Sequence, residues 1–100
     1  MVSRKKVVWD ELARKALKES YYYIKQDSPQ QAERVRREIL EAVRKLADHP
    51  EMYSPDKYRK DKDERFRAFE IYSYRLSYFI AEDTIRVLQL RHVKREPKEY

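Results

Sequence analysis

Residues 65–92, RFRAFEIYSYRLSYFIAEDTIRVLQLRH, decide the fold of this chain. They contain three runs rich in aromatic and β-branched residues, which predict three strands: Arg65 to Tyr72, Tyr74 to Ala81 and Thr84 to His92. The breaks between the runs are very short, so neighbouring strands should be antiparallel. At the break Glu82-Asp83 we expect a two-residue hairpin in which Asp83 takes a positive φ, because the chain contains no Gly.

Two helices are predicted before these strands. Apolar and small residues recur at helical spacing from Asp10, the expected N-cap, to Lys25. Ser28 and Pro29 then supply the cap and the first-turn proline that begin a second helix. Its apolar stripe extends for about five turns to Leu46. The short break between the helices predicts an antiparallel hairpin.

The remaining segments complete a prediction of the fold class. Glu51 to Glu64 is polar and should form a loop, and Lys6 to Trp9 should add a strand at one edge. In the middle run Tyr74, Leu76, Tyr78 and Ile80 share one parity and should face the helices. The predicted class is α+β: an N-terminal edge strand and a two-helix antiparallel hairpin packed on a mainly antiparallel sheet of three C-terminal strands. The other sheet face is expected to be free for function.

Composition limits the classes of protein that fit. One hundred residues, 41% of them hydrophobic, suffice for one domain, and 24 Lys and Arg against 18 Asp and Glu give a net charge of +6. Such a charge favours an acidic or polyanionic partner, although solubility alone explains it equally well. The chain has no Cys and no apolar run long enough for a membrane span. The cytoplasm is therefore the expected compartment.

Several short segments together carry a family resemblance. They are Tyr23-Ile24, Asp27-Ser28-Pro29, Leu46-Ala47-Asp48-His49-Pro50, Arg67-Ala68-Phe69, Tyr74 to Tyr78, Ile85 to Leu88 and the closing Arg91 to Tyr100. In order and spacing this chain resembles the ParE branch of the RelE/ParE toxins of type II toxin-antitoxin systems. The likeness extends over nearly the whole chain, which implies a single toxin domain over residues 1–100.

The absence of Gly and Asn is unusual, since average usage would give about seven Gly alone. Sequences optimised for stability often avoid both residue types. We therefore hypothesise that the chain is an engineered variant of a natural toxin.

The resemblance implies growth arrest by one of two activities. RelE-like members cleave messenger RNA in the ribosome, and ParE-like members inhibit DNA gyrase by protein binding. We expect ribosome-associated mRNA cleavage, with gyrase inhibition, or a stabilised scaffold that keeps only the fold, as alternatives. The implied partners are an acidic antitoxin and either the ribosome with its message or DNA gyrase. Candidate antitoxin contacts are Arg34, Arg37, Lys45 and Arg75.

Metal-free RNA cleavage needs proton-transfer groups and cations, and four residues are candidates: Arg67, Arg75, His92 and Tyr100. Histidine is the residue type that exchanges protons near neutral pH, and the place of His92 at a strand end suits an exposed site. The two arginines fit phosphate oxygens bidentately. The alternatives are a surface histidine with a hydrogen-bonded ring, and arginines paired across strands with Glu70 or Glu82.

The C-terminal tail is expected to lie across or beside the sheet, because Pro97 stops further strand pairing. Its cations are candidates for nucleic-acid binding: Arg91, Lys94, Arg95 and Lys98. Tyr100 could stack on a base or return to the core. No metal or cofactor is expected, since the chain lacks Cys and its two His are isolated.

Overall fold

The structure, a computed structural model, describes residues 4–94 and has the predicted α+β architecture. Its elements are β1 (Lys6–Trp9), α1 (Glu11–Lys25), α2 (Pro29–Lys45), β2 (Phe66–Ile71), β3 (Tyr74–Ile80) and β4 (Thr84–His92). The strand bounds agree with the prediction to within one residue. No helix within residues 4–94 is long and apolar enough to cross a membrane.

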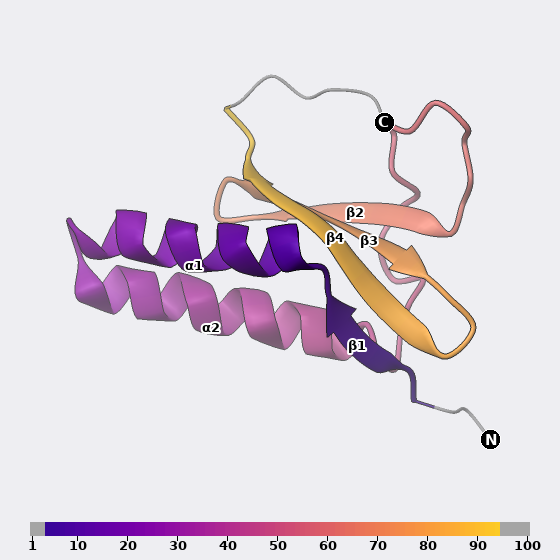
Figure 1. Cartoon of the computed structure of the whole chain (residues 1–100), viewed down its shortest axis with the longest axis horizontal. Helices are drawn as coiled ribbons and strands as arrows, with labels where there is room; N and C mark the ends of the chain where they lie inside the picture. Colours follow the sequence, from indigo (N-terminus) through magenta and orange to yellow (C-terminus); the bar gives the residue numbers. More distant parts are fainter. Residues whose placement is uncertain (1–3, 95–100) are drawn as a thin grey trace.

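The four strands form one sheet in the order β1-β4-β3-β2 (Figure 1). The pairs β2–β3 and β3–β4 are antiparallel, whereas β1 lies parallel to β4, with Lys6 opposite Thr84 and Trp9 opposite Val87. The predicted edge strand and the mainly antiparallel sheet are therefore confirmed. The helical hairpin packs on one face and extends past the sheet at the end where α1 meets α2 (Figure 1).

The two helix starts differ in how they are capped. The Ser28 hydroxyl accepts a hydrogen bond from the Gln31 amide at 3.1 Å, and Pro29 occupies the first turn, as predicted. Asp10 stands at the predicted N-cap of α1, but its carboxylate makes no cap hydrogen bond and instead pairs with Arg86 of β4. The Asp10 amide also donates to the Val87 carbonyl at 2.8 Å, so this residue joins α1 to the sheet.

The core lies between the helical hairpin and the sheet. Ile39 and Val43 of α2 are buried with Leu76 and Tyr78 of β3, which confirms the predicted orientation of that strand. The Tyr78 hydroxyl donates to the Pro50 carbonyl at 2.7 Å. Burial raises the pKa of Tyr78 to about 12, because the phenolate would lose hydration there.

A β-bulge in β4 changes which residues face the helices. Tyr78 lies opposite Val87 and Ser77 opposite Gln89, so Leu88 is an extra residue. Before the bulge Ile85 and Val87 point into the core, and after it Leu90 and His92 lie opposite the core residues Leu76 and Tyr74. His92 therefore shares the helix-facing side of the sheet, where it is half-buried.

The tight turns also differ from the prediction. The Glu82-Asp83 turn has no positive φ, whereas Tyr72 and Ser73, which link β2 to β3, have φ values of 51° and 65°. Two positive φ values match the twist of a two-residue hairpin loop. The prediction for Asp83 is therefore wrong; at this turn Lys5 Nζ donates to the carbonyls of Ala81 and Glu82.

The segment from Glu51 to Glu64 is a loop, as predicted, but it folds back on the sheet. The Asp56 amide donates to the Phe66 carbonyl at 2.8 Å, and the guanidinium of Arg59 lies 3.4 Å from the centre of the Phe66 ring. Phe66 packs on Phe79 on the face away from the helices, with ring centroids 4.6 Å apart. The loop shields these rings, so the expectation that this face is free is wrong over β2 and β3.

The position of Leu76 generates a stability prediction. Leu76 is fully buried, whereas Leu12 on α1 is 77% exposed. Leu76→Ala should lower the free energy of unfolding by about 2 to 4 kcal/mol, since it removes buried methyl groups and leaves a cavity. Leu12→Ala, the matched control, should change it by less than about 0.5 kcal/mol. Urea unfolding followed by circular dichroism measures both, and equal effects would contradict the core described here.

Candidate functional site

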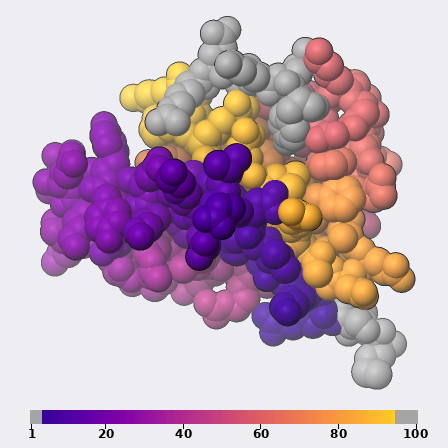
Figure 2. All heavy atoms as spheres, viewed as in Figure 1, coloured from indigo at the N-terminus to yellow at the C-terminus, as the bar shows by residue number. Residues whose placement is uncertain are grey.

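A groove between α1 and the end of β4 is the candidate functional site. It encloses about 550 Å³ and is lined by Ala16, Glu19, Ser20 and Tyr23 of α1 and by Tyr74, Leu90, Arg91, His92 and Lys94 of the sheet. On the face shown in Figure 2, α1 and the yellow end of β4 lie side by side. Three residues predicted for function, Arg91, His92 and Lys94, are therefore brought together here.

His92 has a defined orientation in this groove. Its ring packs edge-on against the Tyr74 ring with centroids 5.2 Å apart, and its Nδ1 accepts a hydrogen bond from the Lys94 amide at 3.1 Å. These two contacts fix the plane of the His92 ring at the edge of the groove.

Arg67 lies away from this groove. It stands opposite Tyr78, whereas His92 stands opposite Tyr74, near the other end of β3. Its guanidinium donates to the Tyr53 carbonyl at 2.8 Å and to the Glu64 carbonyl at 3.0 Å. These bonds use Arg67 to fasten the two ends of the loop 51–64 to β2.

Arg75 lies on the opposite face of the sheet from His92 and is buried. Its guanidinium pairs with Asp56 at 2.8 Å and with Glu70 at 3.5 Å, and it stacks 4.6 Å from the centre of the Tyr58 ring. The pairing with Glu70 is the cross-strand alternative considered from the sequence. Only Arg75 Nε is buried without a hydrogen-bond partner within residues 4–94.

The candidate catalytic residues therefore do not share one surface. Arg91 borders the groove and its guanidinium lies 6.0 Å from the Tyr58 ring, while Lys94 lines the groove. The predicted positions of the tail from Arg95 onwards, including Lys98 and Tyr100, fall outside the described residues. Within residues 4–94 no three His, Cys, Asp or Glu side chains gather as a metal site would need.

Two groups of site residues were not anticipated from the sequence. Glu19, Ser20 and Tyr23 face His92 across the groove, and the helical spacing of Ala16, Ser20 and Tyr23 places them on one side of α1. That spacing is visible in the sequence and would have indicated that these α1 residues share one surface. The buried partner of Arg75, Asp56, stands in a run of charged residues that resembles any solvated loop, so no local pattern marks it.

The chemistry of the groove suits recognition. Its lining combines the polar side chains of His92, Lys94 and Glu19 with apolar walls formed by Leu90 and Tyr74. Convergent polar groups over an apolar floor fix the orientation of a bound segment. The two candidate phosphate clamps, Arg67 and Arg75, are engaged elsewhere in structural contacts.

Arg75 generates a prediction that separates a structural role from a catalytic one. Arg75→Gln should lower the free energy of unfolding by about 3 to 5 kcal/mol, because it removes the guanidinium from a buried ion pair with Asp56. Arg86→Gln, which breaks the pair with Asp10, should cost less than about 1 kcal/mol, since the Arg86 side chain is 59% exposed. Urea unfolding at neutral pH compares them. An Arg75→Gln protein as stable as the parent would contradict a structural role for Arg75.

Comparison with known proteins places the chain in a family. The family described as ParE toxin of type II toxin-antitoxin system, parDE, matches residues 7–97. No curated protein sequence matches significantly.

Two solved structures share the fold. One, titled "Chromosomal ParDE TA system from P. aeruginosa", is 18% identical with a TM-score of 0.70, and the match covers 92% of this chain and 99% of that one. The other, a RelBE2 toxin-antitoxin complex from Mycobacterium tuberculosis, is 19% identical with a TM-score of 0.59, covering 92% of this chain and 94% of that one. At these identities the structures establish the fold alone, whereas the family match spans nearly the whole chain. The chain belongs to the ParE family and is a toxin of the ParE/RelE superfamily of type II toxin-antitoxin systems.

Proposed function

We propose that this toxin arrests growth by binding DNA gyrase in the cytoplasm, and not by cleaving RNA. The observation that carries the proposal is the separation of the candidate catalytic groups. Arg75 is buried on one sheet face with Asp56, while His92 faces the helices on the other. An RNA-cleaving site needs a proton-transfer group and phosphate-binding cations around one phosphate.

The family match supports the same proposal. The match covers residues 7–97 and is with the ParE toxins. Resemblance to that branch implies inhibition of gyrase without a hydrolytic site. Protein binding requires a shaped surface with oriented polar groups, and the groove between α1 and β4 provides one.

Messenger RNA cleavage is the second candidate, and one observation favours it. His92 lines the same groove as Arg91 and Lys94, so a histidine and the Lys94 cation share one surface, while the Arg91 guanidinium lies 6.0 Å from the Tyr58 ring. The third candidate is a stabilised scaffold that keeps the fold but neither inhibits gyrase nor cleaves RNA.

A pair of assays on the purified chain separates these candidates. We expect inhibition of gyrase supercoiling, and intact messages in a reconstituted translation system. His92→Ala should weaken supercoiling inhibition by no more than about tenfold, because it removes one polar contact from the proposed binding groove and no proton-transfer step. Ribosome-dependent message cleavage that His92→Ala abolishes would overturn the proposal, and the absence of both activities would leave only the scaffold.

We further propose that an acidic antitoxin neutralises this chain, as the net charge of +6 favours such a partner. Three of the four predicted contacts, Arg34, Arg37 and Lys45, are exposed on α2. Arg75 is buried against Asp56 and cannot reach a partner, so it drops out of the contact surface.

Charge removal tests this surface. Binding of the acidic protein encoded beside this chain should weaken at high salt, since exposed charges are screened over about 10 Å at 0.1 M. Arg34→Gln/Arg37→Gln/Lys45→Gln should weaken it at least about tenfold at low salt. Lys57→Gln/Lys60→Gln/Lys62→Gln in the loop 51–64 removes the same charge and should have a smaller effect. Calorimetry measures both, and equal affinity at all salt concentrations would exclude electrostatic capture.

A further inference from the structure

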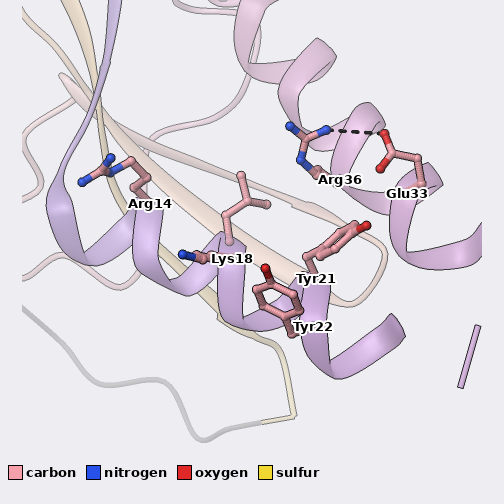
Figure 3. A pocket seen from close by; sticks show the side chains of 7 residues that line it. Arg14, Lys18, Tyr21, Tyr22, Glu33 and Arg36 are labelled. Carbon is pink, nitrogen blue, oxygen red and sulfur yellow. Dashed lines mark hydrogen bonds and ion pairs between the residues drawn. The ribbon is translucent and has the colours of Figure 1, made fainter. Parts of the chain in front are cut away.

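A second groove lies on the helical hairpin, between α1 and α2. It encloses about 500 Å³ and is lined by Arg14, Leu17, Lys18, Tyr21, Tyr22, Glu33 and Arg36 (Figure 3). It has no residue in common with the groove between α1 and β4. Its volume is within the range of roughly 300 to 1,000 Å³ that is typical of ligand sites.

The lining carries more positive than negative charge. Arg14, Lys18 and Arg36 are cations, and Glu33 is the one carboxylate among the lining residues. Lys18 has no ion-pair partner within residues 4–94, whereas Arg36 pairs with Glu33 at 3.4 Å. Arg14 pairs with Glu11 at 3.3 Å. Exposed helix pairs of this kind contribute little stability, so both guanidiniums can turn to a bound phosphate at small cost.

The charge excess of the whole chain is concentrated in the same part. Residues 4–45 hold twelve Lys and Arg against seven Asp and Glu, a net charge of +5. The remainder of the described chain, residues 46–94, holds ten against nine and contributes only +1. A polyanion approaching the molecule is therefore attracted to the N-terminal segment and the helical hairpin.

Aromatic rings stand among these cations. The rings of Tyr21 and Tyr22 meet edge to face, with centroids 5.5 Å apart and an interplanar angle of 79°. Tyr22 is 53% exposed, and Lys25 Nζ lies 6.0 Å from the centre of its ring. A flat, accessible ring bordered by cations is the arrangement on which an unpaired base stacks.

We propose that this groove binds single-stranded nucleic acid, with phosphates on Arg14, Lys18 and Arg36 and a base on Tyr22. An acidic protein helix fits less well, because such helices need a row of apolar anchor sites and the groove offers one aliphatic side chain, Leu17. The inference is independent of the gyrase proposal, which uses no residue of this groove.

Fluorescence anisotropy with a short fluorescein-labelled oligodeoxythymidylate tests the proposal on the purified chain. A plot of the logarithm of the binding constant against the logarithm of the salt concentration should have a slope of about −2. Each of the three phosphate contacts contributes about −0.7 to this slope. Arg14→Gln/Lys18→Gln/Arg36→Gln should weaken binding at least about tenfold and bring the slope close to zero. Tyr22→Leu should weaken it about tenfold and leave the slope unchanged, since stacking involves no counterion release.

The control Lys57→Gln/Lys60→Gln/Lys62→Gln removes three charges from the loop 51–64 and should weaken binding by less than about threefold. Equal losses in both triple variants would overturn the proposal, because only net charge would then matter. Binding of labelled polyglutamate that the groove variant abolishes, without binding of the oligonucleotide, would also overturn it in favour of an acidic protein partner. Thermal melts check that each variant is folded. The single variant Lys18→Glu, at an exposed position, should also weaken binding of the oligonucleotide.

Discussion

The extra residue at Leu88 is the constraint on which the arrangement of the sheet depends. β4 is a central strand that pairs with both β1 and β3, so a change in its alternation alters what each sheet face presents. Ile85 and Val87 fill the core on one side of the bulge, and Leu90 fills it on the other. Without the extra residue, Gln89 and Arg91 would point at the helices. The bulge keeps polar side chains out of the core over all nine residues of β4.

The opposite sheet face depends on the ion pair between Arg75 and Asp56. It joins β3 to the loop 51–64, and Tyr58 of that loop covers the Arg75 guanidinium. Taking two charges out of water is costly, so the pair adds less net stability than its 2.8 Å geometry suggests. Its main effect is to specify where a long irregular loop lies. Both arginines expected to hold phosphate, Arg67 and Arg75, anchor this loop instead.

Local patterns were sufficient to predict the elements of this fold. Period-two alternation in β3 and the Ser28-Pro29 start of α2 depend only on neighbouring residues, and both predictions are confirmed. The failures involve relations between distant segments. Arg75 meets a carboxylate 19 positions away, and Lys5 donates to the carbonyl of Ala81, 76 positions away. The bulge escaped prediction because Leu88 and Gln89 continue an ordinary strand sequence. As a result, the sequence did not indicate that His92 lies on the helix-facing side of the sheet.

The parallel pairing of β1 with β4 affects how the chain folds during its synthesis. Lys6 and its partner Thr84 are separated by most of the chain, and β4 also supplies Ile85, Val87 and Leu90 to the core beneath the helices. During synthesis α1, α2 and the β2–β3 hairpin are made first, but β1 has no strand to pair with until β4 has left the ribosome. Such non-local closure is slow, because the entropy of ordering the intervening chain is lost before the contacts form. The four-stranded sheet, and with it the groove between α1 and β4, can therefore form only after β4 has been synthesised.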